Sequence, residues 1–114
     1  MFSNPFSRST RAADPDSIDF EAFEKAVSEG EATVVDVREP HEFAAGHIPD
    51  ALNLPLSRFD PKQLPSGKPV VLICQSGRRS LNALNQARAI GREDAKHYAG
   101  GMNGWRSRNG ALAG

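Results

Sequence analysis

The sequence predicts an α/β fold built around a parallel sheet. Two observations support this class. Residues 33–37 (Thr-Val-Val-Asp-Val) and 70–73 (Val-Val-Leu-Ile) are short β-branched or aliphatic runs, which are typical of strands buried on both faces of a parallel sheet. Segments with helical spacing or helix-capping residues lie between and after these runs, so strands and helices alternate along the chain.

The length and charge of the chain limit its domain count and its partners. At 114 residues it is long enough for one hydrophobic core but not for two. Charged residues make up 25% of the chain and their signs balance, so no overall field attracts nucleic acid or an acidic membrane surface. We therefore expect a single domain that binds neither nucleic acid nor membranes.

The apolar pattern and the cysteine count predict a soluble, cytoplasmic protein without a metal ion or cofactor. No apolar run approaches the roughly 18 to 20 residues that cross a bilayer, and residues 1–13 lack the continuous apolar stretch of a secretory signal. Cys74 is the only cysteine, which excludes an internal disulfide. The three histidines stand at spacings that do not complete a cysteine-based metal site.

The first 16 residues differ in composition from the rest of the chain. They are rich in Ser, Pro, Arg and Asn, a composition that cannot bury enough apolar surface to offset the entropy of ordering the chain. We expect residues 1–16 to form a flexible N-terminal arm and residues 17–114 to form the folded domain. Arg8 and Arg11 among serines also resemble an organelle transit peptide, but Pro5 and the short length argue against one.

The first half of the domain predicts a helix, a buried strand, a helical turn and a short strand. Asp19 can cap a helix whose apolar positions Phe20, Phe23 and Val27 fall at helical spacing. Gly30 ends this helix. The strand at 33–37 follows, then one helical turn at 41–45 closed by Gly46, and a short strand near 51–53 between two prolines.

The second half predicts the most buried strand, a long helix and a weaker strand and helix. Residues 57–68 are polar, with a weak helix before Leu64. The apolar run at 70–73 leads into a tight loop and a helix at 80–90. Residues 96–98 predict a weak last strand, Gly100-Gly101 a turn, and 102–108 a short helix anchored by the only tryptophan, Trp105.

Cys74 stands at the junction of a predicted strand and a predicted helix. In an open parallel sheet, ligands bind where strands end and helices begin, because backbone N–H groups and the helix dipole there attract negative charge. Arg78 and Arg79 follow closely. The helix terminus and the two arginines both favour the thiolate, so we expect a depressed pKa for Cys74.

The composition of the loop decides between a reactive and an inert cysteine. A lone free cysteine at the end of an apolar strand is more often an inert buried residue. Here Gly77 lets the loop curl so that N–H groups point inward, and the Ser76 and Ser80 hydroxyls add donors for a tetrahedral anion or a terminal sulfur. Such a loop with two arginines is costly for packing alone, so we interpret Cys74 as a nucleophile.

Three segments of the chain resemble the rhodanese domain family. The first begins at Asp36 and reads Asp-Val-Arg-Glu-Pro-x-Glu-Phe-x-x-Gly-His-Ile-Pro-x-Ala-x-Asn-x-Pro, ending at Pro55. The second is the loop Cys74-x-x-Gly77-x-Arg79-Ser80, and the third is Gly100-Gly101 followed by Trp105. Together they extend the resemblance over roughly residues 17–110, nearly everything but the arm.

The resemblance implies a three-layer fold with a five-stranded parallel sheet flanked by helices, and it implies sulfurtransferase activity. In this family the loop cysteine takes sulfur from a small anionic donor such as thiosulfate, or from a persulfide, and passes it to a thiophilic acceptor, cyanide or a thiol. Carried over, Cys74 is the catalytic residue that holds the persulfide. The substrate-binding loop around it comprises Gln75, Ser76, Gly77, Arg78, Arg79 and Ser80.

Several other polar residues are interpreted as structural. Asp36 and Arg38 end a predicted strand, where we expect an ion pair with a partner such as Glu42 and, for Asp36, a role in orienting the loop. His47 belongs to a structural turn in the family, and persulfide transfer between thiols of low pKa needs no base.

We interpret Phe43 and Trp105 as packing residues, and Arg88, Arg92, Arg106 and Arg108 as solvated surface charges.

Two other functions stay open beside sulfur transfer. Rhodanese-fold phosphatases use a cysteine in the same place, but they place five residues between it and the arginine, whereas four separate Cys74 from Arg79. Ile73 also stands where many cysteine phosphatases have a histidine that helps hold the thiolate. Other rhodanese-like domains are non-catalytic regulatory modules, but these usually lack the cysteine.

Overall fold

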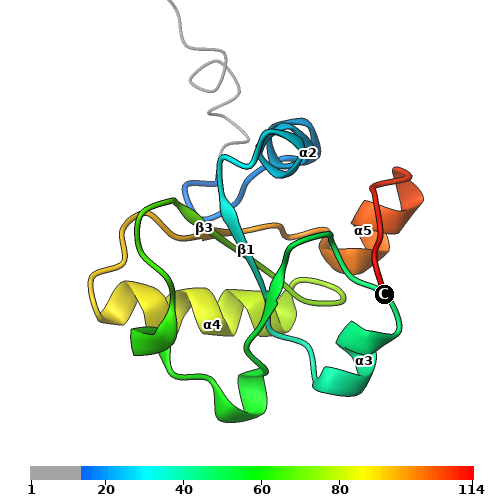
Figure 1. Cartoon of the computed structure of the whole chain (residues 1–114). Helices are drawn as coiled ribbons and strands as arrows, with labels where there is room; N and C mark the ends of the chain where they lie inside the picture. The colour runs from blue at the N-terminus through cyan, green and yellow to red at the C-terminus, as the bar shows by residue number, and fades with distance from the viewer. Residues whose placement is uncertain (1–13) are drawn as a thin grey trace, which may run out of the picture.

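The computed structural model describes residues 14–114 of the chain (Figure 1). The predicted arm falls largely on residues 1–13, which lie outside the described residues, so the arm and its boundary stay a prediction. Within the described part, Pro15 and Asp16 contact the last strand of the sheet. The Lys96 ammonium donates to the Pro15 carbonyl at 2.6 Å, and the His97 N–H donates to the Asp16 carbonyl at 2.9 Å.

Four parallel strands form the sheet, in the order β2-β1-β3-β4. β1 (Thr33–Asp36) and β3 (Val70–Ile73) lie at the centre, and β2 (Leu52–Asn53) and β4 (Lys96–His97) flank them. Thr33 pairs with Val70 and Asp36 with Ile73, so the two central strands end at the same level. The predicted α/β class with a parallel sheet is confirmed.

The expected fifth strand is reduced to a single bridge, and this detail of the prediction is wrong. Ser17 forms one parallel bridge with His97 at the free edge of β4, where the Ile18 N–H donates to the His97 carbonyl at 3.1 Å. Pro15 has no N–H to donate, and the backbone turns at Asp19 into a helix. The extended segment between them is too short for a strand.

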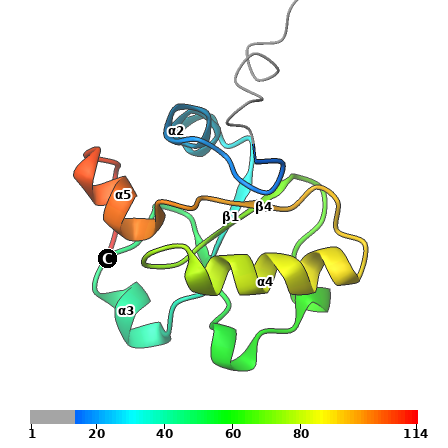
Figure 2. The ribbon, with the colours of Figure 1, turned by 180° about the vertical axis from the view of Figure 1, so that it is seen from behind.

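Helices cover both faces of the sheet and complete the predicted three-layer arrangement. α2 (Phe20–Glu29) and α5 (Gly101–Ser107) pack on one face, and α4 (Arg78–Ala89) packs on the other, as Figure 2 shows. The 3₁₀ turns η2 (Leu56–Arg58) and η3 (Pro61–Gln63) lie on the α4 side and take the place of the weak helix expected before Leu64. α3 (Pro40–Ala44) follows the carboxyl end of β1.

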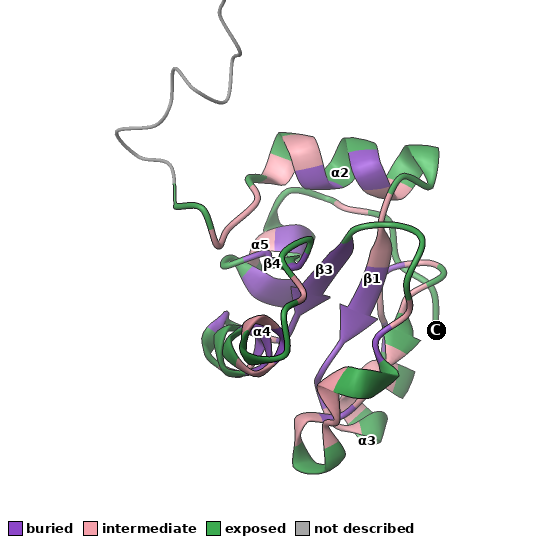
Figure 3. Cartoon of the chain, turned by 90° about the vertical axis from the view of Figure 1, so that its left-hand side faces the viewer, coloured by how far each residue is buried: buried purple, intermediate pink, exposed green. Residues whose placement is uncertain are grey.

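The alternation of side chains along β3 divides the interior into two clusters and sets the direction of Cys74. Val70, Leu72 and Cys74 belong to the cluster under α4, whereas Val71 and Ile73 belong to the cluster with α2 and α5. All four residues of β3 are buried (Figure 3). The second cluster is rich in aromatic rings, with Phe23, Tyr98 and Trp105 in contact.

The ends of α2 and α4 are set by local residue chemistry. The Asp19 carboxylate accepts the Ala22 N–H at 2.8 Å and Gly30 ends α2 with φ 66°, as predicted. α4 begins at Arg78, earlier than the predicted residue 80, because Gly77 with φ 100° is its N-cap and accepts the Leu81 N–H at 3.1 Å. Three of the predicted loop residues, Arg78, Arg79 and Ser80, therefore lie in the first helical turn.

Two arginines join segments of the fold, so their interpretation as solvated surface charges is wrong. Arg88 donates to the Asp16 carboxylate at 2.8 Å and to the Ala95 carbonyl at 2.7 Å. Arg92 donates to the carbonyls of Leu64 and Pro65 and pairs with Asp94. Both guanidinium groups satisfy backbone carbonyl oxygens outside the strands, a role that local sequence does not distinguish from exposure.

Candidate active site

Cys74 lies directly after β3, and only Gln75, Ser76 and Gly77 separate it from α4. We call residues 74–80 the Cys74 loop. Its backbone folds back on the sulfur: the Gly77 N–H donates to Cys74 Sγ at 3.1 Å and the Ser80 N–H donates at 3.2 Å. The thiol sits 3.5 Å from the Ser80 hydroxyl and is 1% exposed. The loop therefore surrounds the sulfur with hydrogen-bond donors, as the strand-to-helix junction predicted.

These donors lower the pKa of the Cys74 thiol. Burial alone raises the pKa, because a thiolate is poorly solvated in the interior. Hydrogen bonds from the Ser80 hydroxyl and from the N–H groups of Ser80, Gly77 and Ser76 outweigh burial and hold the pKa of Cys74 below its ordinary value. The predicted direction is correct, and hydrogen bonds rather than the two arginines are its main cause.

Backbone contacts with the Gly100-Gly101 turn hold the Cys74 loop in place. A Cβ atom at Gly77 would meet the Ala99 carbonyl oxygen at 2.4 Å, and one at Gly101 would meet the Gln75 carbonyl oxygen at 2.3 Å. Glycine is required where two backbones approach this closely. The N–H groups of Met102 and Asn103, in α5, then donate to the Cys74 and Gln75 carbonyls at 2.8 Å and 3.1 Å.

Asp36 and Arg38 form a buried ion pair beneath the loop. Arg38 Nε lies 3.0 Å from Asp36 Oδ1, and Arg38 Nη2 lies 2.8 Å from Asp36 Oδ2. Arg38 also donates to the Gly46 carbonyl at 2.8 Å and to Gln75 Oε1 at 3.3 Å. The expected pairing with Glu42 is wrong, because the two residues satisfy each other. The pair touches the Cys74 loop through Gln75, and its role in orienting the loop stays a prediction.

The two arginines of the loop face different surroundings. Arg79 forms a two-point pair with Glu42 of α3, at 2.7 Å and 3.0 Å. The hydrogen bond from Arg79 lowers the pKa of Glu42 to about 2. Arg78 is exposed at the start of α4, and within residues 14–114 no carboxylate forms an ion pair with it. Of the two, Arg78 is the cation left to face solvent near the loop.

Two histidines have different positions relative to the site. His47 stacks on Phe43, with ring centroids 3.7 Å apart, and its Nδ1 lies 2.8 Å from the Phe43 carbonyl, which places it in the turn after α3. His97 is buried, and its Nδ1 lies 2.8 Å from the Ser80 hydroxyl. The sequence did not single out His97. The pairing of His97 with Leu72 becomes visible only in the structure, where it brings the imidazole to Ser80.

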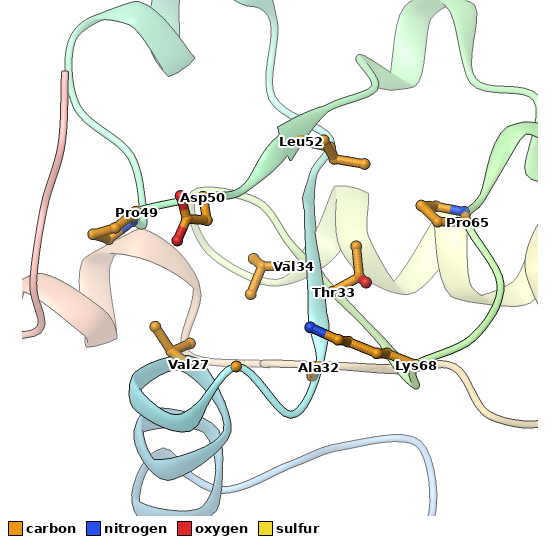
Figure 4. Close-up of a pocket in the computed structure, with 10 residues that line it drawn as sticks. Val27, Ala32, Thr33, Val34, Pro49, Asp50, Leu52, Pro65 and Lys68 are labelled. Carbon is orange, nitrogen blue, oxygen red and sulfur yellow. The ribbon is translucent and has the colours of Figure 1, made fainter.

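A separate cavity of about 320 Å³ lies at the amino ends of the strands, away from the Cys74 loop (Figure 4). It is mostly apolar, with Lys68 and Asp50 as its charged lining residues. The whole lining comprises Val27, Gly30, Ala32, Thr33, Val34, Pro49, Asp50, Leu52, Pro65 and Lys68. None of the predicted site residues belongs to it.

The arrangement at Cys74 can stabilise a thiolate and a negatively charged sulfur bonded to it. Converging N–H groups at the N-terminus of a twelve-residue helix favour negative charge at this point. In the part of the chain that the structure describes, no group of three or more His, Cys, Asp or Glu side chains is placed to hold a metal ion. The converging donors thus meet at one atom, Cys74 Sγ.

The comparisons with known sequences point to one family. Residues 19–108 match the rhodanese-like domain family. An uncharacterized Synechocystis protein is 55% identical over 75 residues, covering 64% of this chain, and the match spans 42% of that protein's length. Human thiosulfate:glutathione sulfurtransferase is 34% identical over 95 residues, which cover 69% of this chain and 83% of the human protein.

The fold comparison agrees with the sequence comparison. The crystal structure of a rhodanese-related protein from Thermoplasma volcanium superposes with a TM-score of 0.76 at 29% identity, covering 85% of this chain and 96% of that one. Among the described residues, no helix is both long and apolar enough to span a bilayer.

Proposed function

The chain belongs to the rhodanese-like domain family, and we propose that it is a thiosulfate sulfurtransferase that carries sulfur as a persulfide on Cys74. One observation carries the proposal: two backbone N–H groups converge on Cys74 Sγ at 3.1 Å and 3.2 Å, at the N-terminus of α4. This geometry supports a thiolate nucleophile. The human relative named as a thiosulfate:glutathione sulfurtransferase supports the same donor and a thiol acceptor.

In the first half-reaction the Cys74 thiolate attacks the outer sulfur of thiosulfate. A new S–S bond forms to Cys74, the S–S bond of thiosulfate breaks, and sulfite leaves with the electron pair. The product is a persulfide whose terminal sulfur carries the negative charge. The N–H donors of the Cys74 loop and the dipole of α4 stabilise that charge.

In the second half-reaction a thiophilic acceptor removes the terminal sulfur. A thiolate or cyanide attacks this sulfur, the S–S bond to Cys74 breaks, and the Cys74 thiolate leaves with the electron pair. The depressed pKa of Cys74 makes it a good leaving group in this step. No oxidant, reductant or cofactor enters the cycle.

Charge near the loop supports an anionic donor. Arg78 is exposed at the first turn of α4 and adds its charge to the helix terminus. The backbone surrounding Cys74 carries donors rather than acceptors on the side of the sulfur. A dianion such as thiosulfate is attracted by both features, whereas an uncharged disulfide is not.

The position of Arg79 disfavours the alternative of a phosphatase. A phosphate-binding loop needs a guanidinium directed at the phosphoryl oxygens. Arg79 instead binds both oxygens of Glu42, in another helix. A regulatory module is the other alternative, and the retained thiol with its lowered pKa argues against it. We further propose a cytoplasmic location, where a single thiol stays reduced.

The test is a mass spectrum of the protein after incubation with thiosulfate and removal of excess donor. We expect a gain of about 32 mass units, one sulfur atom, in the wild type and none in Cys74→Ala. Addition of cyanide should return the wild type to its original mass. A wild-type protein that gains no sulfur, or a Cys74→Ala variant that does, would contradict the proposal.

A further inference from the structure

A serine and a histidine stand in line behind the nucleophile. Ser80 Oγ lies 3.5 Å from Cys74 Sγ and 2.8 Å from His97 Nδ1. Cys74, Ser80 and His97 are 1%, 0% and 4% exposed, so all three side chains lie in the interior. The register explains the alignment: His97 pairs with Leu72, two residues before Cys74, and both side chains face α4, which carries Ser80.

Because Ser80 has a single hydroxyl proton, the hydrogen bonds among Cys74, Ser80 and His97 can be arranged in two ways. A hydroxyl has one proton to donate, yet Ser80 Oγ has three neighbours, the third being the Gly77 carbonyl at 3.2 Å. When His97 is neutral with its proton on Nε2, a Cys74 thiol can donate its S–H to Ser80 Oγ and the Ser80 hydroxyl can donate to His97 Nδ1. A thiolate instead needs the Ser80 hydroxyl as a donor, which requires a proton on Nδ1 that donates to Ser80 Oγ.

We propose that Ser80 and His97 form a proton relay that activates Cys74, with His97 acting as a positioning residue through Ser80. The thiol proton moves to Ser80 Oγ while the original Ser80 proton moves to His97 Nδ1. The products are a thiolate that accepts a hydrogen bond from Ser80 and an imidazolium that donates one to it. The proton count balances, and no other reactant takes part. The inference deepens the proposed function, on which it rests.

The surroundings of His97 favour its neutral form before the proton transfer and its charged form afterwards. Burial lowers the pKa of His97, so its ring is neutral and able to accept a proton. The carboxylates of Asp14 and Asp16 oppose this effect and favour the imidazolium once it forms. Asp16 is also paired with Arg88, and the neighbouring Lys96 donates to a backbone carbonyl. Cys74 contacts the same Ser80 hydroxyl as His97, and a thiolate there favours an imidazolium.

The first test measures the rate of Cys74 alkylation by iodoacetamide against pH, which requires no sulfur donor. His97→Asn keeps a hydrogen-bonding group near Ser80 but cannot take up a proton. We expect this variant and Ser80→Ala to shift the midpoint of the profile upward by about one pH unit, which is about a tenfold slower reaction at pH 6.5. The matched control His41→Asn, at an exposed histidine of α3, should react as the wild type does.

The second test follows His97 in the wild-type protein by NMR of the imidazole nitrogens. Alkylation of Cys74 removes the thiolate, so the midpoint of His97 titration should fall by about one unit, and Ser80→Ala should weaken this coupling. This measurement stands even where a variant fails to fold.

Two results overturn the relay: a wild-type alkylation profile in folded His97→Asn, or a His97 titration that alkylation leaves unchanged. Failure of sulfur transfer is a separate result, since neither measurement uses a sulfur donor.

Discussion

Arg79 in the first turn of α4 holds Glu42 of α3 at two points, with Nη1–Oε1 at 2.7 Å and Nη2–Oε2 at 3.0 Å. Glu42 Oε1 also accepts the Glu39 N–H at 2.9 Å, so the same carboxylate caps α3. The pair therefore ties the helix that follows the nucleophile to the helix that follows β1. It is a structural clamp at the carboxyl edge of the sheet.

The clamp predicts a pH dependence of stability. The pKa of Glu42 falls from its ordinary 4.5 to about 2 in the folded chain, so its stabilising effect is complete above pH 4.5 and is lost as pH falls toward about 2. The side chains are 33% and 25% exposed, so screening limits the effect to about 1 kcal/mol. Urea unfolding followed by Trp105 fluorescence should show Glu42→Gln less stable by this amount at pH 6 and nearly equal to the wild type at pH 2.

The control is Glu24→Gln, at an exposed position of α2, which should unfold as the wild type does at both pH values. An equal loss from Glu42→Gln at both pH values would mean that shape, not charge, holds the clamp.

The two arginines of the loop should have separable roles. Arg78→Ala removes an exposed charge near the anion site and should raise the KM for thiosulfate about fivefold, the scale of ~1 kcal/mol, with little change in kcat. Arg79→Ala should lower the free energy of unfolding by about 1 kcal/mol and change KM less. Steady-state kinetics with cyanide as acceptor checks both. As a control, Lys68→Ala removes one positive charge at the amino ends of the strands and should leave KM unchanged. Equal changes in KM from Arg78→Ala and Lys68→Ala would refute a local role for the Arg78 charge.

Gly101→Ala should disturb the Cys74 loop beyond the cost of its backbone conformation. Its φ is 63° and an added Cβ would meet the Gln75 carbonyl oxygen at 2.3 Å. Gly30 has nearly the same φ, 66°, and an added Cβ there meets nothing closer than 4.0 Å, so Gly30→Ala should cost only about 1 kcal/mol. We expect Gly101→Ala to unfold at lower urea than Gly30→Ala and to slow thiol alkylation. Matching behaviour of the two variants would show that the close approach is unimportant.

Asp50 offers a site for stabilisation. It adopts φ 67°, in the left-handed region that glycine enters without strain. The turn is therefore kept at some cost in strain. Asp50→Gly should raise the free energy of unfolding by about 0.5 to 1 kcal/mol in urea titration, and Asp50→Val should lower it. A destabilising Asp50→Gly would indicate that the carboxylate makes a contribution larger than the strain.

The length of the Cys74 loop predicts poor phosphatase activity. Four residues lie between Cys74 and Arg79, so fewer N–H groups converge on three phosphoryl oxygens than in a longer loop. The wild type should fail to hydrolyse p-nitrophenyl phosphate, and inserting one residue after Gly77 should reduce sulfur transfer to cyanide. Efficient phosphate hydrolysis by the wild type, without reaction with thiosulfate, would favour the phosphatase alternative.

Patterns of one or a few neighbouring residues predicted much of the fold. The Asp19 cap, the Gly30 terminus and the buried run at β3 follow from local chemistry, and the structure confirms each. The reduced fifth strand was not predictable, because it depends on how Ser17 meets His97 across 80 positions of the chain. Register and edge pairing are tertiary properties that short-range patterns do not encode.

In the candidate site, too, local features were predicted and tertiary contacts were not. Position after a core strand together with the composition of the following loop pointed to Cys74, and its donors Gly77 and Ser80 lie within six residues. The partners of the polar side chains could not be predicted from the sequence, because Arg79 meets Glu42 and Ser80 meets His97 only after the strands align. The pairing of Asp36 with Arg38, although local, was missed because a strand end allows either residue to turn elsewhere.

The attachment of the Cys74 loop to α5 has a consequence for synthesis of the protein on the ribosome. The carbonyls of Cys74 and Gln75 are held by N–H groups of Met102 and Asn103, which leave the exit tunnel after the thiol has emerged. Until α5 docks, the loop lacks these two anchors. The Cys74 loop therefore reaches its complete set of backbone hydrogen bonds only after α5 has been synthesised and has docked.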